Sequence, residues 1–223
     1  MPDNQRLADA LEQGLQALDL GQVESLQDKL LTYLELLQRW NGAYNLTAIR
    51  DPLQMVTRHI LDSLVLVPYI PASAQRLIDV GTGAGLPGIP LAIVNPHQHY
   101  DLLDSNGKKT RFLFQVKTTL GLDNISVHHV RAESWHPPKP YDVVLSRAFA
   151  SLQDMLACCS HFCDKSGLFL AMKGVRPDAE LAAVEQLCGH RQVYSLQVPG
   201  LDEERHLVEL GLARQSSQGN QVG

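Results

Sequence analysis

The sequence predicts an α/β protein in which an open, mostly parallel sheet carries helices on both faces and follows an N-terminal helical extension. Leucines recur at helical spacing early in the chain, and from Arg76 onward short apolar runs alternate with helical segments. The 223 residues, 44% of them hydrophobic, suffice for one full domain and an extension. We therefore expect an extension over residues 1–70, a sheet domain over 71–213 and a flexible tail over 214–223.

Three helices are predicted in the extension. Two leucine series place amphipathic helices over residues 5–18 and 22–41, through Leu7, Leu11, Leu15 and Leu18 and then Leu26, Leu30, Leu34 and Leu37. A third helix is predicted over 52–67, because Asp51 and Pro52 are residue types that favour the N-cap and the first helical position. The extension is expected to pack on the sheet domain.

Five apolar runs predict the strands of the sheet, namely RLIDV, HYDLLDS, ISVHHV, YDVVLS and GLFLAMK. Helices are predicted between and after them, over residues 87–95, 107–120, 151–163 and 177–189. Two late strands, near 191–198 and 205–212, are expected to run antiparallel. Ligands of such open sheets bind beyond the carboxyl ends of the strands, where we expect the site.

Composition excludes several classes of protein. Polar residues or prolines interrupt each apolar stretch before the roughly 20 residues that a bilayer requires, and the polar N-terminus does not resemble a signal peptide, so we expect a cytoplasmic protein. The cysteines lack the spacing of a disulfide framework or zinc site and are interpreted as reduced helix residues: Cys158, Cys159, Cys163 and Cys188. No histidine pair has metal-ligand spacing, and no metal is expected.

A glycine-rich loop joins the first strand to the next helix, with Gly81, Gly83 and Gly85 at alternate positions. Such a turn lets a ligand approach the backbone and a helix N-terminus. The next strand ends at Asp104, 23 residues after Gly81, where a carboxylate can accept hydrogen bonds from the ribose hydroxyls of an adenosine. Dinucleotide folds also use an acid there, but the GxGxG spacing and the acid Asp79 before the loop favour a cationic sulfonium or amino group over a pyrophosphate.

Basic residues are concentrated in one part of an acidic chain. The whole sequence has 19 basic and 24 acidic side chains, whereas residues 105–150 have seven basic and three acidic ones. The basic residues of this segment are Lys108, Lys109, Arg111, Lys117, Arg131, Lys139 and Arg147. If they share one face they could bind a polyanion, and the alternative is a solvated helix surface.

Seven segments, taken in order, resemble those of the bacterial glucose-inhibited division protein B family: RWNGAYNLTAI, RHILDSL, IDVGTGAGLPGIPLAIVNP, LLDSNGKKTRFL, VRAES, VLSRAFASL and LAMKG. The resemblance extends from about Leu30 to Leu210. It implies a Rossmann-like S-adenosylmethionine-dependent methyltransferase sheet and methylation of N7 of guanine 527 in 16S ribosomal RNA. The implied partner is 16S ribosomal RNA or the small ribosomal subunit, and the protein is expected to be a monomer without membrane contacts.

The resemblance also implies roles for particular residues. The residues expected to bind S-adenosylmethionine are Gly81, Gly83, Leu86, Asp104, Ala132, Glu133 and Arg147. Arg147 and Lys173, each at the end of a strand, are expected to be the catalytic groups. The residues expected to bind RNA are Lys108, Lys109, Arg131, Arg147, Lys173 and Arg205.

The chemistry of guanine N7 agrees with these residues. N7 carries a free lone pair and a sulfonium methyl group is already activated, so in-line transfer needs positioning and electrostatics but no general base. No Asn/Asp-Pro-Pro-aromatic motif for exocyclic amines follows the fourth strand, since His136-Pro137-Pro138-Lys139 precedes it. Two alternatives remain open, a small-molecule methyltransferase and an NAD-dependent oxidoreductase, and a vestigial binding module is disfavoured by the intact glycines and Asp104.

Overall fold

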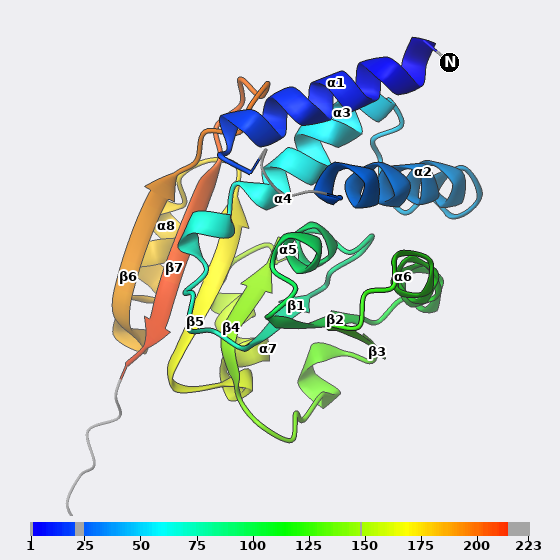
Figure 1. Ribbon diagram of the computed structural model, residues 1–223. Helices are drawn as coiled ribbons and strands as arrows, with labels where there is room; N and C mark the ends of the chain where they lie inside the picture. Colours follow the sequence, from blue (N-terminus) through cyan, green and yellow to red (C-terminus); the bar gives the residue numbers. More distant parts are fainter. Residues whose placement is uncertain (1, 21–24, 148, 214–223) are drawn as a thin grey trace, which may run out of the picture.

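A seven-stranded sheet forms the centre of the structure, which is a computed structural model describing residues 2–20, 25–147 and 149–213 (Figure 1). The strand order is β3-β2-β1-β4-β5-β7-β6. The strands are β1 (Arg76–Val80), β2 (His99–Asp104), β3 (Ile125–His129), β4 (Tyr141–Ser146), β5 (Cys163–Lys173), β6 (Cys188–Ser195) and β7 (His206–Leu212). The predicted α/β class is confirmed.

The direction of the strands places five carboxyl ends at one edge of the sheet. Strands β1 to β5 are parallel to one another, whereas β7 is antiparallel to both β5 and β6. Strand β1 lies between β2 and β4, so the strand order reverses beside it, and this switch point is where open sheets bind ligands. Lys173 at the end of β5 pairs with His206 at the start of β7, which brings Arg205 to the same edge.

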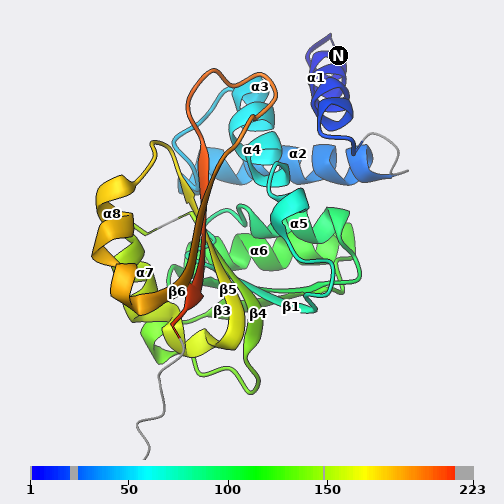
Figure 2. The same cartoon turned by 90° about the vertical axis from the view of Figure 1, so that its left-hand side faces the viewer.

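Helices cover both faces of the sheet (Figure 2). On one face lie α5 (Gly88–Val94) and α6 (Gly107–Leu120), and on the other lie α7 (Leu152–Cys159) and α8 (Asp178–Ala183). Successive strand residues point to opposite faces, so Leu77 joins the core under α5 and α6, and Ile78 joins the core under α7. These two apolar layers hold the sheet edge in place.

The N-terminal helices pack on the α5 and α6 side and share its apolar core. They are α1 (Pro2–Ala17), α2 (Leu26–Tyr44), α3 (Pro52–Met55) and α4 (Asp62–Leu64), with a π-helix η1 (Val56–Leu61) between α3 and α4 and a 3₁₀ turn η2 (Val67–Tyr69) after them. The helix predicted over 52–67 is therefore interrupted by a π turn, a feature that often marks functional sites. Asp51 caps it as predicted, accepting a hydrogen bond from the Leu53 amide.

Two predicted helices end earlier than expected, because residues at the end of each predicted range belong to a paired strand instead. Helix α7 stops at Cys159, a 3₁₀ turn η4 (Ser160–Phe162) follows, and Cys163 pairs with Tyr141 as the first residue of β5. Helix α8 stops at Ala183, a 3₁₀ turn η5 (Glu185–Leu187) follows, and Cys188 pairs with Leu212 to begin β6. The interpretation of all four cysteines as helix residues is thus wrong for Cys163 and Cys188, although every one is a free thiol.

The basic residues of 105–150 do not share one face, so the alternative in which this whole segment forms a single polyanion-binding face is wrong. Lys117 lies in the last turn of α6 and donates a hydrogen bond to the carbonyl of Ile125, at the amino end of β3. Lys139 precedes β4 and also lies at the amino edge. A helix that crosses between parallel strands runs from the carboxyl edge back to the amino edge, so one segment delivers side chains to both.

The remaining expectations concern membrane helices, metal sites and the C-terminal tail. No helix among the described residues is long and apolar enough to cross a bilayer. Over those same residues, histidine, cysteine and acidic side chains nowhere gather into a group that could hold a metal ion. The expected flexible tail, residues 214–223, lies outside the part of the chain that the structure describes.

Candidate functional site

Three neighbouring cavities open along the carboxyl edge of the sheet. The β2–β3 cavity, about 320 Å³, is lined by Val80, Gly81, Leu103, Asp104, Ser105, Lys109, Val130, Arg131, Ala132, Glu133 and Phe149. The glycine-loop cavity, about 210 Å³, is lined by Leu46, Thr47, His59, Gly81, Thr82, Gly83, Ala84, Leu86 and Arg147. The arginine cavity, about 250 Å³, is lined by Ile49, Arg58, His59, Asp62, Arg147, Met172, Lys173, Gly174 and Arg205. Gly81 joins the first cavity to the second, and Arg147 and His59 join the second to the third.

Asp79 holds the glycine loop from beneath. Its Oδ2 accepts hydrogen bonds from the Thr82 hydroxyl at 2.6 Å and from the Gly88 amide at 2.8 Å. Burial raises the pKa of this carboxyl to about 6, against the opposing effect of those hydrogen bonds. Its Oδ1 has no hydrogen-bond partner among the described residues. The acid therefore lies under the loop, where it orders the backbone that lines the glycine-loop cavity.

The N-terminal extension supports the same loop from the other side. Tyr33 of α2 is fully buried, and its hydroxyl donates a hydrogen bond of 2.8 Å to the carbonyl of Ala84. The amides of Gly81 and Thr82 donate to the carbonyl of Leu103 at the end of β2. The loop is thus fixed to the extension on one side and to the sheet on the other before any ligand binds.

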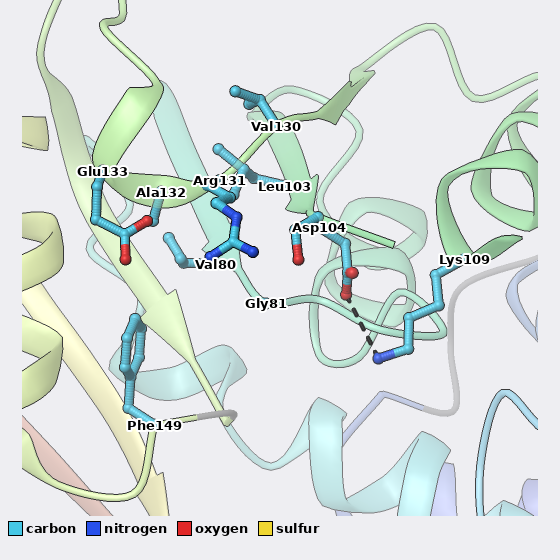
Figure 3. A pocket seen from close by; sticks show the side chains of 11 residues that line it. Val80, Gly81, Leu103, Asp104, Lys109, Val130, Arg131, Ala132, Glu133 and Phe149 are labelled. Carbon is cyan, nitrogen blue, oxygen red and sulfur yellow. Dashed lines mark ion pairs between the residues drawn. The ribbon is translucent and has the colours of Figure 1, made fainter. Parts of the chain in front are cut away.

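Acidic and basic side chains face each other across the β2–β3 cavity (Figure 3). Asp104 is buried; its Oδ2 accepts from the Gly83 amide at 2.9 Å and lies 3.6 Å from the Lys109 ammonium, and its Oδ1 accepts from the Asn106 amide. Figure 3 shows the Arg131 guanidinium directed into the cavity and Glu133 on the side opposite Asp104. Arg131, expected to bind RNA, therefore lies with Ala132 and Glu133 in this cavity instead of the arginine cavity.

Ion pairs connect the three arginines that line the arginine cavity. Asp62 is buried; its Oδ2 accepts from Arg147 Nη1 at 3.0 Å, and its Oδ1 accepts from Arg205 Nε at 3.0 Å. Glu203, half exposed, pairs with Arg58 at 2.6 Å and with Arg205 at 3.3 Å. The chain therefore brings together cations from η1, from the end of β4 and from the segment before β7.

His59 lies between the glycine-loop and arginine cavities as a neutral imidazole. Burial and the nearby Arg147 charge lower its pKa to about 4. Because the carbonyl of Arg58 can only accept, Nδ1 carries the proton and donates to it at 3.0 Å, which leaves Nε2 to accept from the Thr47 hydroxyl at 2.9 Å. The imidazole therefore adds a rigid, uncharged wall to the site.

Lys173 also lines the arginine cavity, but its charge is offset within the protein. Its ammonium pairs with Glu180 at 2.8 Å and donates to the carbonyls of Phe149 and Ala150. The same carboxylate of Glu180 accepts from the Leu152 amide at the start of α7. Lys173 thus connects β5 to the segment after β4.

The structure brings the expected site residues to one edge of the sheet. Gly81, Asp104, Lys109, Arg131, Ala132 and Glu133 line the β2–β3 cavity, Gly81, Gly83 and Leu86 line the glycine-loop cavity, and Lys173 and Arg205 line the arginine cavity. Lys108 is exposed at the start of α6, beside this edge. Four further residues line these cavities without a role predicted from the sequence, although the segment RHILDSL was part of the resemblance: Thr47, Arg58, His59 and Asp62.

The thiols are not part of the linings of the three cavities, although the Cys158 thiol donates a hydrogen bond of 3.7 Å to Oε1 of Glu133, which lines the β2–β3 cavity. Cys158 and Cys159 belong to α7, and none of the four cysteines lines a cavity described above. Burial raises the pKa of Cys163 to about 12 and also raises the pKa of Cys158, Cys159 and Cys188. Thiols in such surroundings are poor nucleophiles.

Solved structures share this fold at low sequence identity. A SAM-dependent methyltransferase from Aquifex aeolicus superposes with a TM-score of 0.54 at 16% identity, over 73% of this chain and 94% of that chain. A precorrin-6y C5,15-methyltransferase from Geobacter metallireducens superposes with a TM-score of 0.51 at 14% identity, over 77% and 93% of the two chains. The open sheet with helices on both faces is therefore a fold that these methyltransferases share.

The family model of rRNA small subunit methyltransferase G matches residues 26–208. A ribosomal RNA small subunit methyltransferase G from Yersinia pseudotuberculosis is 56% identical over 183 residues, which cover 82% of this chain and 88% of the relative. One from Saccharophagus degradans is 48% identical over 207 residues, 93% and 92% of the two chains. The chain belongs to the rRNA small subunit methyltransferase G family, and its cofactor is S-adenosylmethionine.

The residues present suit that cofactor. A Cβ atom added to Gly83 would meet only the Lys109 ammonium at 3.8 Å and a loop carbonyl at 3.9 Å, so the loop backbone faces open space. Asp104 offers a buried carboxylate at the same place, and the β2–β3 cavity, extended by the glycine-loop cavity beside it, is of the size that small-molecule ligands occupy.

Proposed function

We propose that this protein methylates N7 of guanine 527 in 16S ribosomal RNA, as a monomer acting in the cytoplasm on the RNA or on the small ribosomal subunit. The observation that carries the proposal is Arg147, which lines both the glycine-loop cavity and the arginine cavity. A methyl donor over the glycine loop and a nucleotide held by the arginines would therefore meet at one side chain. The names of the relatives support ribosomal RNA as the substrate class.

In this proposal the cofactor-binding residues are Gly81, Gly83, Leu86, Asp104, Ala132, Glu133 and Arg147. Asp104 would accept hydrogen bonds from the ribose hydroxyls, since a carboxylate has more lone pairs than its two backbone bonds use. Ala132 and Glu133 would lie against the adenine, and the glycine loop would hold the amino acid part. When bound, the cofactor supplies a methyl group already activated by a sulfonium.

The remaining task of the protein is to hold the guanine. The lone pair of N7 forms the new N–CH₃ bond as the S–CH₃ bond breaks, and a neutral thioether leaves, so no proton has to be removed by the protein. Arg147 and Lys173 would act as the catalytic pair, with the Arg147 fork suited to the guanine O6 edge or to a phosphate. The neutral imidazole of His59 adds no charge that would repel the sulfonium.

The direct test is incubation of the protein with S-adenosylmethionine and small-subunit RNA or particles from cells that lack the enzyme. Chemical cleavage at N7-methylguanine should give one new signal, at guanine 527. Methylation at another nucleotide would contradict the proposed site. Methylation of a small molecule with no RNA product would favour the small-molecule alternative.

Replacement of Asp104 by alanine should weaken S-adenosylmethionine binding by about 1–3 kcal/mol, because the ribose hydroxyls lose their buried acceptor. Isothermal titration calorimetry measures this directly. The matched control is Asp123→Ala, which removes an exposed acid with no ion pair among the described residues. Equal affinity of Asp104→Ala and the wild type would remove Asp104 from the site.

RNA binding should weaken with salt, with a slope of log K against log salt near −0.7 for each phosphate contact on single-stranded RNA. Lys108→Gln should reduce the magnitude of this slope by about 0.7, since Lys108 lies beside the carboxyl edge. Lys139→Gln is the matched control, because this lysine is also exposed but lies at the amino edge. A filter-binding series would measure both, and equal slopes for the two variants would be evidence against RNA at this edge.

A further inference from the structure

Asp62 is the anion that two cavity arginines share. It is a buried residue in the wall of the arginine cavity, and each of its carboxylate oxygens accepts one guanidinium hydrogen bond of 3.0 Å, from Arg147 and from Arg205. The two arginines come from different strand ends and contact the same acid from opposite oxygens. Two guanidinium groups this close would repel each other without the charge between them.

The position of Asp62 follows from the π turn. Asp62 is the first residue after η1, whose six residues Val56–Leu61 carry Arg58 and His59 into the same cavity. The other acid of the network, Glu203, is half exposed, so solvent screens its pairs with Arg58 and Arg205. Asp62 is thus the buried member, and removing one partner of a buried ion pair has much larger effects than removing an exposed one.

A shared anion fixes the geometry of both arginines and uses only one donor group of each guanidinium. A guanidinium has five N–H groups, and Arg147 uses Nη1 for Asp62 and for the carbonyl of Arg58 at 3.5 Å. Its planar fork is therefore held in one orientation beside the glycine-loop cavity. Such preorganisation lowers the cost of ordering the side chains when a polyanion binds.

We propose that Asp62 is a positioning residue for methyl transfer to RNA, holding Arg147 and Arg205 side by side in the arginine cavity without touching the RNA itself. This inference rests on the proposed function. Asp62→Asn should lower kcat/KM for the RNA substrate by about tenfold or more, because the guanidinium groups lose their fixed geometry. The Kd for S-adenosylmethionine should change much less than kcat/KM, because Asp62 lines neither cavity assigned to that cofactor and acts on it only through Arg147.

Two matched variants separate positioning from general damage. Glu204→Gln makes the same change of charge beside Arg205, at an exposed acid whose carboxylate has no ion pair among the described residues, and should keep wild-type kinetics. Asp62→Glu should recover part of the loss because it restores the anion. Wild-type RNA kinetics for Asp62→Asn would overturn the proposal, and so would a loss of cofactor affinity as large as the loss in kcat/KM.

A second comparison covers the case in which Asp62→Asn alone does not fold. The double variant Asp62→Asn/Arg205→Gln removes both charges together and is compared with Arg205→Gln alone. The double variant should be slower, because Arg147 loses its anion only there; equal rates would overturn the proposal. If the wild type methylates no RNA, the proposed function fails, whereas a wild type that methylates RNA beside an unaffected Asp62→Asn variant defeats only the role of Asp62.

Discussion

Arg147→Ala should lower the turnover number for RNA methylation by about a hundredfold or more, because a small misplacement of the reacting groups costs that much. Arg147 lines both the glycine-loop and the arginine cavities and is held by Asp62 at 3.0 Å, whereas Arg58, Lys173 and Arg205 line the arginine cavity but not the glycine-loop cavity. The affinity for S-adenosylmethionine should fall much less than turnover. Single-turnover kinetics with labelled cofactor, together with calorimetry, measure the two effects separately.

Two further variants sharpen this prediction. Arg147→Lys keeps the charge but loses the fork, so partial activity would indicate that charge contributes and the bidentate contact accounts for the rest. The triple variant Cys158→Ala/Cys159→Ala/Cys163→Ala should keep most activity, because attack by a ring nitrogen needs no thiolate. Wild-type turnover by Arg147→Ala, or a covalent RNA adduct on any cysteine, would show that the mechanism is wrong.

Gly85→Ala should destabilise the protein by about 3 kcal/mol and abolish measurable cofactor binding at ordinary concentrations. Gly85 has a φ of +93°, which an alanine adopts only with strain. A Cβ there would lie 2.4 Å from Cγ1 of Ile89 and 2.9 Å from Cδ2 of Leu113, both fully buried side chains with no room to move. Urea unfolding measures the stability and calorimetry the binding.

Two other glycines provide controls for Gly85. Gly83→Ala also has a positive φ, +62°, but an added Cβ would meet no packed carbon, so the expected loss is only about 1 kcal/mol. Gly42→Ala, in the exposed part of α2 with nothing within 4 Å, should stabilise by about 0.5–1 kcal/mol. Equal stability of the Gly85→Ala and Gly83→Ala variants would contradict the packing argument.

Local pattern was sufficient for most of the fold and for the loop that lines the cofactor site. The leucine spacing predicted α1 and α2, and the alternation of apolar runs predicted the parallel strands β1 to β4 nearly residue by residue. Pattern failed where pairing between distant strands decided the outcome, as for Cys163 and Cys188, which are strand residues because Tyr141 and Leu212 pair with them. Sheet pairing of this kind is a property of partners far away in the chain.

The arginine cavity could not be predicted from local pattern either, because its residues come from distant parts of the chain. Asp62 and Arg147 are separated by 85 residues, and Asp62 and Arg205 by 143, so no local spacing predicts that one carboxylate holds both. The π turn was not predicted either. Its extra residue per turn rotates the side chains that follow it about the helix axis, and nothing in the helical pattern of 52–67 indicates such a turn.

The amino-acid sequence by itself determined the class of sheet, the glycine loop and the strand-end positions of Asp104, Arg147 and Lys173, because periodicity and turn chemistry are local properties. Tertiary structure decided which charges act together. In the folded protein Lys117 and Lys139 lie at the amino edge of the sheet. Arg58, Asp62 and Arg205 lie around Arg147 at the carboxyl edge. The physical reason is that strand order and direction place each side chain at an edge, and ion pairs form only between groups that the assembled sheet has brought within a few ångströms.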